Sequence, residues 1–203
     1  MHFDKLRAIA VTGAVVAGMG LGVATQALQG SLGGSSAVLA NSGAVWVFVA
    51  FVLGLVMPTS HVAAVGGATC LVAASISYYV AVDVFERISS APRGAIVWSM
   101  AGIVAGSAFG FAGFVARHNQ EQRHSAWGLL AGVVVGEGIH LTWYVGNKAL
   151  RPAGIAELAV AGIIVILALC RARSAVVVAA ITASAALTTL LATSLINRAF
   201  VSF

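Results

Sequence analysis

The sequence predicts an all-α fold, a polytopic transmembrane helical bundle that forms one domain over residues 1–203. Hydrophobic residues make up 60% of the chain and charged residues only 8%, and the mean hydropathy is +1.00. Soluble domains carry about 25% charged residues, so this composition is typical of a chain whose outer surface faces lipid. Apolar stretches long enough to cross a bilayer also recur along the whole chain.

We predict seven membrane spans, each near the roughly 20 residues that a helix needs to cross the hydrocarbon core. They cover residues 8–28, 41–57, 61–82, 95–116, 125–145, 153–170 and 174–196. The second span is short and ends before Pro58, so a re-entrant form of this segment would reduce the number to six. The longest connection, residues 29–40, is rich in glycine and serine and carries no charge.

Glycines at four-residue spacing mark the fourth and fifth spans. They are Gly102, Gly106 and Gly110 in the fourth span and Gly128, Gly132 and Gly136 in the fifth. Small residues at this spacing allow two helix backbones to approach closely. We therefore expect the fourth and fifth spans to form a tightly packed hairpin.

Polar and aromatic residues gather at one end of the predicted bundle if the spans alternate in direction. That end collects Gln26, Gln29, Asn41, Trp46, Tyr78, Tyr79, Asp83, Trp98, Trp143, Tyr144 and Glu157. The opposite end collects Lys5, Arg7, Arg117, His118, Arg123, His124, Arg171 and Arg173. Interfacial aromatic residues normally occur at both membrane surfaces, so this asymmetry predicts a cavity at the aromatic end.

The fifth span carries an acidic residue, Glu137, near the middle of the apolar stretch 128–144. An ionisable group at that depth is costly unless it is protonated, paired or turned to a cavity, so it is a candidate functional residue. His140 and Tyr144 share its helix face, and Trp143 lies three residues beyond His140. The alternative is a buried Glu137–His140 pair that only locks two helices together.

Two further acids lie nearer the predicted interface. Asp83 follows Tyr79 by four residues, so the phenol can reach the carboxylate, and Arg87 can pair with Asp83 instead. Glu157 falls in the first turn of the sixth span, where the helix dipole favours an anion and Arg151 lies in reach. We expect both acids to stay ionised, as partners of Glu137 or as structural charges.

The segment LANSGAVW, residues 39–46, opens the second span. Asn41 or Ser42 is a natural N-cap that would satisfy amide donors in the absence of water. Alternatively, Asn41 turns toward the cavity and holds a ligand or the neighbouring acid.

Several classes of site are missing from the sequence. No His, Cys and Asp set has metal-ligand spacing, and no nucleotide-binding or diphosphate–magnesium motif is present, so we expect no metal and no other cofactor. The net charge of +5 is not carried by a basic run interleaved with aromatic residues, which argues against nucleic acid as a partner. Cys70 and Cys170 lie in separate apolar spans, so neither a disulfide nor a zinc site is expected.

Four short motifs carry a resemblance: Gln29, LANSGAVW, the Tyr78–Tyr79 pair and the segment Glu137-Gly-Ile-His140. Together they resemble a family of small bacterial membrane proteins, which implies a place in the bacterial plasma membrane. In size, span number and scattered acids the chain also resembles the integral-membrane terpene cyclases. That resemblance implies that an acid protonates an olefin or epoxide of a lipophilic prenylated molecule and that ring closure follows.

The chemistry of these residue types agrees with that implication. A carboxyl group withheld from water keeps its proton until use, and aromatic faces stabilise a carbocation. We expect Glu137 to be the catalytic acid, assisted by Asp83 and Glu157. The expected substrate-binding residues are Gln29, Asn41, Trp46, Tyr78, Tyr79, His140, Trp143 and Tyr144. The function predicted is cyclisation of a farnesyl-type chain in the bilayer; the alternatives are a vitamin-like ligand-binding subunit of a transporter and a structural subunit without a pocket.

Overall fold

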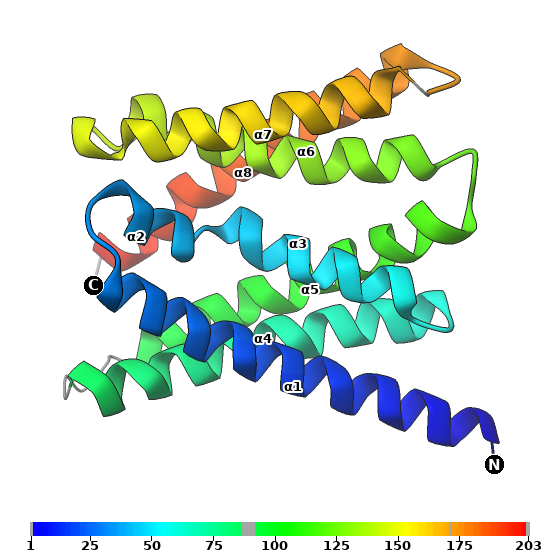
Figure 1. Ribbon diagram of the computed structural model, residues 1–203, viewed down its shortest axis with the longest axis horizontal. Helices are drawn as coiled ribbons and strands as arrows, with labels where there is room; N and C mark the ends of the chain where they lie inside the picture. Colours follow the sequence, from blue (N-terminus) through cyan, green and yellow to red (C-terminus); the bar gives the residue numbers. More distant parts are fainter. Residues whose placement is uncertain (1, 87–91, 171, 202–203) are drawn as a thin grey trace.

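The computed structural model describes residues 2–86, 92–170 and 172–201, and Figure 1 shows them as a bundle of long helices. The helices are α1 (His2–Ser31), α2 (Ser35–Ala40), α3 (Gly43–Val56), α4 (Ser60–Glu86), α5 (Pro92–His118), α6 (Arg123–Ile139), α7 (Arg151–Leu169) and α8 (Ala175–Val201). A π-helical turn, η1 (His140–Tyr144), extends α6, and a short 3₁₀ turn, η2 (Lys148–Leu150), precedes α7. The described residues contain no strand, which confirms the all-α class.

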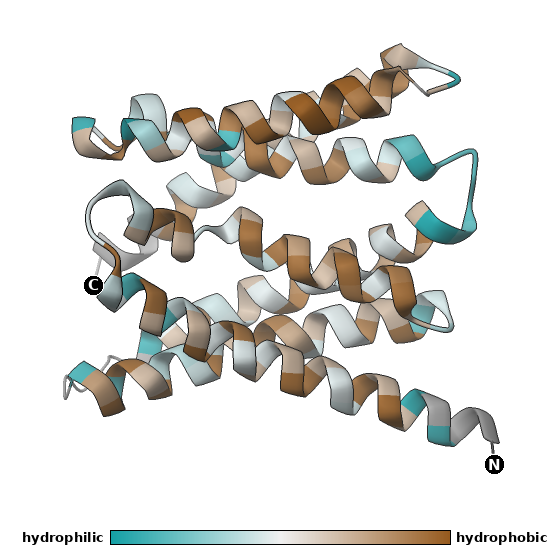
Figure 2. Cartoon of the chain, viewed as in Figure 1, coloured by the Kyte–Doolittle hydropathy of each residue, from teal (hydrophilic) through white to brown (hydrophobic). Residues whose placement is uncertain are grey.

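The helices run back and forth along one axis, so that α1 begins at the end of the bundle opposite to the end of α8 (Figure 1). In the described part of the chain, six segments are long and apolar enough to cross a membrane; α2 and α3 form one of them. The remaining rod, α6, has 17 helical residues and is prolonged by η1. Figure 2 shows hydrophilic residues gathered near the ends of the rods, as expected for an integral membrane protein.

The connection predicted over residues 29–40 is largely helical. Helix α1 continues to Ser31, and α2 occupies Ser35–Ala40 before the chain enters α3. The second span is therefore a discontinuous helix that is interrupted at Asn41 and Ser42. Gly34 adopts a left-handed φ of 59° between α1 and α2, which allows the tight reversal there.

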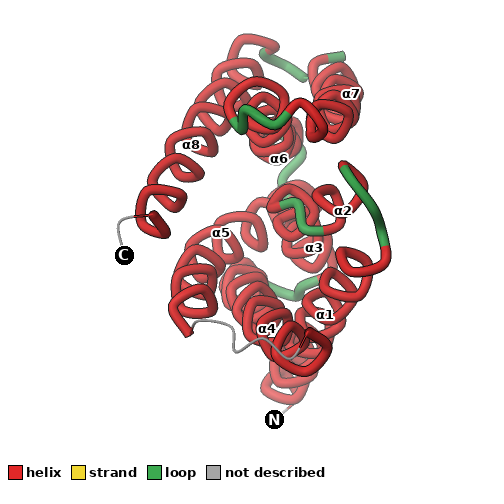
Figure 3. Tube along the Cα trace, turned by 90° about the vertical axis from the view of Figure 1, so that its left-hand side faces the viewer, coloured by secondary structure: helices red, strands yellow, loops and turns green. Residues whose placement is uncertain are grey.

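Two groups of helices lie side by side in Figure 3, one of α1, α3, α4 and α5 and the other of α6, α7 and α8. They meet where α3 and α5 face α6. The buried side chains at this junction include Phe51, Phe109 and Leu130. The Phe51 ring also packs on Trp127 of α6, with ring centroids 4.8 Å apart.

The glycine-rich helices pack closely, but their partners differ from those we predicted. The glycines of α5 face α4, where the backbones of Gly106 and Gly67 leave no room for a side chain on either residue. The glycines of α6 face Thr182, Ala185 and neighbouring small residues of α8. The predicted contact between the fourth and fifth spans is confirmed, since Phe109 of α5 packs in one cluster with Leu130 of α6, but the prediction that their glycines form this contact is wrong. The spacing of small residues indicates that another helix packs closely, but it does not identify that helix. Here α4 and α8 also present small residues, and they pack against the glycines of α5 and α6.

Candidate functional site

The break between α2 and α3 leaves the first amide groups of α3 without partners in the helix itself. The first amide groups of a helix have no intrahelical partner, and lipid offers none. Ser42 occupies the N-cap position of α3, but its hydroxyl makes no capping hydrogen bond. We predicted that the side chain of Asn41 or Ser42 would cap this helix. Ser42 does hold the N-cap position, but neither side chain accepts a hydrogen bond from the helix amides, so this prediction is wrong.

Glu137 of α6 supplies the missing cap. The amide of Gly43 donates to its Oε1 at 3.0 Å, and the amide of Ala44 donates to its Oε2 at 2.7 Å. Two amide donors at the positive end of a helix favour an ionised carboxylate. Glu137 thus fastens α6 to the start of α3, and we assign it the negative charge of the site.

His140 does not take part in this arrangement. No hydrogen bond joins it to Glu137 within the described residues; its ring lies parallel to that of Tyr144, with centroids 6.4 Å apart. The expectation of a Glu137–His140 pair is therefore wrong. Glu137 binds two backbone amides instead. These donors are already fixed in place, so binding them does not require the entropy cost of ordering a second side chain.

Glu157 of α7 has the opposite environment. Its side chain is 5% exposed, and neither carboxyl oxygen has a hydrogen-bond partner among the described residues. The prediction that Glu157 lies in a first turn beside Arg151 is wrong, because α7 already begins at Arg151 and Glu157 falls in its second turn. Glu157 is consequently buried, and Arg151 makes no hydrogen bond to its carboxyl group.

The carboxyl groups of Glu137 and Glu157 are close enough to interact electrostatically, and the Ser42 hydroxyl adjoins both. Two like charges in an apolar interior are strongly unfavourable, so the pair is expected to retain one proton. Since Glu137 already accepts two amide hydrogen bonds, the proton belongs on Glu157. The site is a carboxylate next to a neutral carboxylic acid.

Glu157 lines a cavity of about 320 Å³ that we call the acid groove, and both of its carboxyl oxygens are buried beneath the surface of that groove. The acid groove lies between α3 and α7, with α6 as its floor, and all of its lining is apolar except Glu157 and Ser42. Its lining residues are Leu39, Ser42, Ala44, Val45, Phe48, Leu130, Val134, Ala156, Glu157, Val160 and Ile164. Val45, Phe48 and Val160 are 41–52% exposed, so the groove belongs to the lipid-facing surface.

A second cavity, of about 190 Å³, lies on the other side of α3 and is here called the aromatic cavity. Of the expected substrate-binding residues, it gathers Asn41, Trp46, Tyr78 and Tyr79. Tyr78 packs edge-on against Trp46 and Tyr79, at 6.2 Å and 5.2 Å between ring centroids, and donates to Gln29 Oε1 at 2.9 Å. Gln29 therefore holds the Tyr78 hydroxyl but does not line the cavity itself.

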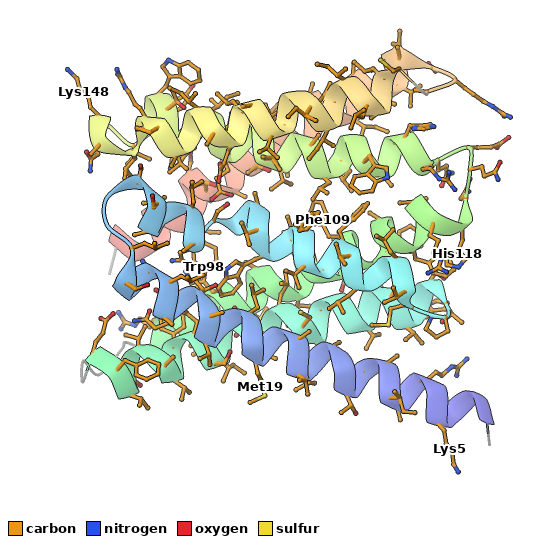
Figure 4. All side chains as sticks on the ribbon, in the orientation of Figure 1. Lys5, Met19, Trp98, Phe109, His118 and Lys148 are labelled. Carbon is orange, nitrogen blue, oxygen red and sulfur yellow. The ribbon has the colours of Figure 1, made fainter. Side chains whose placement is uncertain are left out.

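Trp98 of α5 also lines the aromatic cavity, although it is not among the predicted site residues. Its position in the first half of the fourth span, toward the polar end, is the signal that could have identified it, and Figure 4 shows it in the half of the bundle away from His118. Ser75 of α4 is a second such residue, with no sequence signal beyond its place in an apolar span.

The remaining predicted residues lie elsewhere. Trp143 and Tyr144 are 63% and 69% exposed and line neither cavity, so the prediction that they line the same cavity as Trp46 is wrong. Both residues lie in the π-helical turn η1, where the amide of Val145 donates to the carbonyl of His140, five residues back. Asp83 is exposed near the end of α4 and lines neither cavity. Arg87 and Arg171 lie outside the described residues.

Helix α3 divides what we predicted as one cavity into two. Asn41 and Gly43 face the aromatic cavity, whereas Ser42 and Ala44 face the acid groove. Aromatic rings and the neutral acid therefore lie on opposite sides of the helix start that Glu137 caps. Among the described residues, no three His, Cys, Asp or Glu side chains come together as they would to hold a metal ion.

No curated protein and no solved structure is significantly similar to this chain. One sequence family covers nearly its whole length, with a match over residues 4–200. That match includes the α2–α3 break, both acids and both cavities. The protein is thus a member of DUF6518, a family of unknown function.

Proposed function

We propose that this protein is an integral-membrane enzyme that protonates a prenyl chain and so initiates its cyclisation, in the plasma membrane of a bacterium. One observation carries the proposal: Glu157, whose buried carboxyl group has no hydrogen-bond partner among the described residues, lines a lipid-facing groove that is apolar except for this acid and Ser42. A prenylated molecule would partition into the bilayer and reach the groove laterally. Water, which would quench a carbocation, is disfavoured by the same apolar walls.

The proposed reaction begins with proton transfer from Glu157 to an alkene carbon. The π-electron pair forms the new C–H bond, and the adjacent carbon becomes a carbocation. A second alkene of the chain then attacks this carbon and forms the ring C–C bond. Loss of a proton to the Glu157 carboxylate restores both the enzyme and an alkene, so the product is an isomer of the substrate.

Charge supports Glu157, rather than Glu137, as the acid in this proposal. Glu137 is held by two amides and has no proton to give, whereas a neutral Glu157 keeps its own until an alkene arrives. After transfer the site holds two carboxylates, and the carbocation beside them compensates the second charge. Phe48 supplies an aromatic face in the same groove.

The test uses membranes that contain the protein, incubated with a linear farnesylated compound in deuterated water. We expect an isomeric product of the substrate that carries one additional deuterium from the exchangeable acid. Glu157→Gln removes that proton while it preserves shape, and conversion should fall by about 10²–10⁴-fold. Full activity of Glu157→Gln, or a product without deuterium, would refute the proposal.

A second candidate function is the ligand-binding subunit of a transporter. The observation in its favour is the discontinuous α2–α3 span beside the aromatic cavity, because interrupted helices commonly form the substrate sites of transporters. Under this function, Trp46→Ala would abolish uptake of the ligand and Glu157→Gln would have little effect. Uptake by whole cells, compared with conversion by isolated membranes, separates the two candidates.

A further inference from the structure

A further cavity adjoins the acid groove. It has a volume of about 430 Å³ and is lined by Arg123, His124, Trp127, Ile164, Leu167 and Ala168. It shares Ile164 with the acid groove and lies between the same two helices, α6 and α7. The two cavities therefore follow one another along the α6–α7 pair.

Helical spacing shows that one stripe on each helix lines the combined groove. On α6 the stripe is Arg123, Trp127, Leu130 and Val134, and on α7 it is Glu157, Val160, Ile164 and Leu167. These intervals of three and four residues keep each set on a single helix face. From Glu157 to Leu167 the groove extends for about 15 Å at 1.5 Å per residue.

The two ends of this groove differ in chemistry. One end has the neutral acid Glu157, and the other has the guanidinium of Arg123 with the imidazole of His124. The Nε of Arg123 donates to the carbonyl of Ala116 at 2.9 Å, which fixes the side chain and leaves its terminal nitrogens for another acceptor. Between the ends the lining is hydrocarbon and the Trp127 ring.

We propose that the combined groove binds a single prenyl chain whose phosphate headgroup lies against Arg123 and His124 and whose far end lies at Glu157. This inference rests on the proposed function and names its substrate class. A guanidinium matches the oxygens of a phosphate, and an apolar channel of this length suits an extended chain of three isoprene units. The alkene that receives the proton is then the one farthest from the headgroup, and the phosphate is retained in the product.

The experiment measures equilibrium binding of farnesyl phosphate and of farnesol to the full-length protein in phosphatidylcholine nanodiscs. Arg123→Gln should weaken farnesyl phosphate binding by about tenfold or more and leave farnesol binding unchanged. Arg117→Gln is the matched control, because Arg117 also donates to a backbone carbonyl at this end of the bundle but does not line the groove. Equal losses in the two arginine variants would overturn the headgroup assignment.

A second pair of variants tests the channel. Ile164→Trp fills the shared segment and should abolish binding of both probes, whereas Ile163→Trp, at a neighbouring site 60% exposed and outside the groove, should not. If phosphatidylglycerol in the nanodisc displaces farnesyl phosphate completely, the groove holds a bilayer lipid and the inference fails. Farnesyl phosphate binding without any isomeric product would refute the cyclase function but support the assigned ligand. Conversion of farnesol that is insensitive to Arg123→Gln would support the cyclase function but refute the assigned phosphate headgroup.

Discussion

Two glutamates of the same chain are given different roles by what surrounds them. Glu137 meets the start of a helix and accepts two of its amides, while Glu157 meets only hydrocarbon, a serine hydroxyl and the charge of Glu137. The first is therefore a structural anion, and the second is a reservoir for a proton. A substitution at each position should affect a different property of the protein.

At Glu137 we predict a loss of stability. Glu137→Ala leaves the amides of Gly43 and Ala44 unpaired and should destabilise the protein by about 2–4 kcal/mol. Thermal unfolding in detergent measures the effect. Glu121→Ala is the control, since that acid forms an exposed ion pair with Arg173 whose loss should cost less than about 1 kcal/mol. Equal unfolding temperatures for the two variants would contradict the capping role.

At Glu157 we predict that Glu157→Gln unfolds at a temperature no lower than the wild type, because no hydrogen bond to the carboxyl group is lost. The same measurement thus separates the two acids: one variant loses stability, and the other loses only turnover. A strongly destabilised Glu157→Gln would show that the acid has a structural partner after all.

The sequence identified Glu137 as exceptional but not its partner. Its depth in an apolar span was readable, whereas the donors that bind it lie 93 and 94 residues away along the chain. They are backbone amides, which every residue possesses, so no side-chain pattern reveals them. For Glu157, we predicted that the sixth span begins at residue 153, whereas α7 begins two residues earlier, at Arg151. The prediction therefore placed Glu157 at the membrane interface, although it lies in the interior.

At the scale of the helix, we predict that two glycines of α1 respond oppositely to the same change. Gly22→Ala would place a methyl group against the backbone of Ala74 and the hydroxyl of Ser77 on α4, so the two helices must separate. A methyl group at Gly20 meets no atom within 4 Å, and Gly20→Ala should stabilise the helix by up to about 1 kcal/mol. Unfolding in detergent compares the two, and a stable Gly22→Ala would contradict the close packing of α1 and α4.

Helix positions followed from hydropathy, but helix pairing and helix irregularities did not. The ends of α4 and α5 lie within a few residues of the predicted bounds because charged residues and proline limit an apolar span. The π-helical turn after Ile139 left no mark in the sequence, and it contains the exposed Trp143 and Tyr144. Pairing of glycine-rich faces likewise depends on competition among several smooth surfaces.

For the whole molecule, we predict that the two chain termini lie on opposite sides of the membrane. The described start of α1 and the described end of α8 occupy opposite ends of the bundle (Figure 1). Terminal tags on intact and permeabilised cells should therefore become accessible under different conditions. If both tags are protected or exposed together, one of the rods does not cross the membrane and the prediction fails.

The composition was sufficient to predict the class of the molecule, because a chain with 8% charged residues cannot cover a soluble surface of this size. The division into two helix groups was not readable, because helix pairing depends on which small-residue surfaces meet in the folded bundle. As a result, the groove between α3 and α7 could not be anticipated, although each residue that lines it stood in the sequence.

The cap on α3 also has a consequence for the order of events during synthesis. When residues 35–56 leave the ribosome, the carboxylate that satisfies Gly43 and Ala44 has not yet been made, because it follows by 93 residues or more. A bare helix start within lipid would be unfavourable by several kcal/mol per unsatisfied group. The second span must therefore wait in another form, as an uninterrupted helix or at the headgroup layer, and acquire its break only once α6 has entered the membrane.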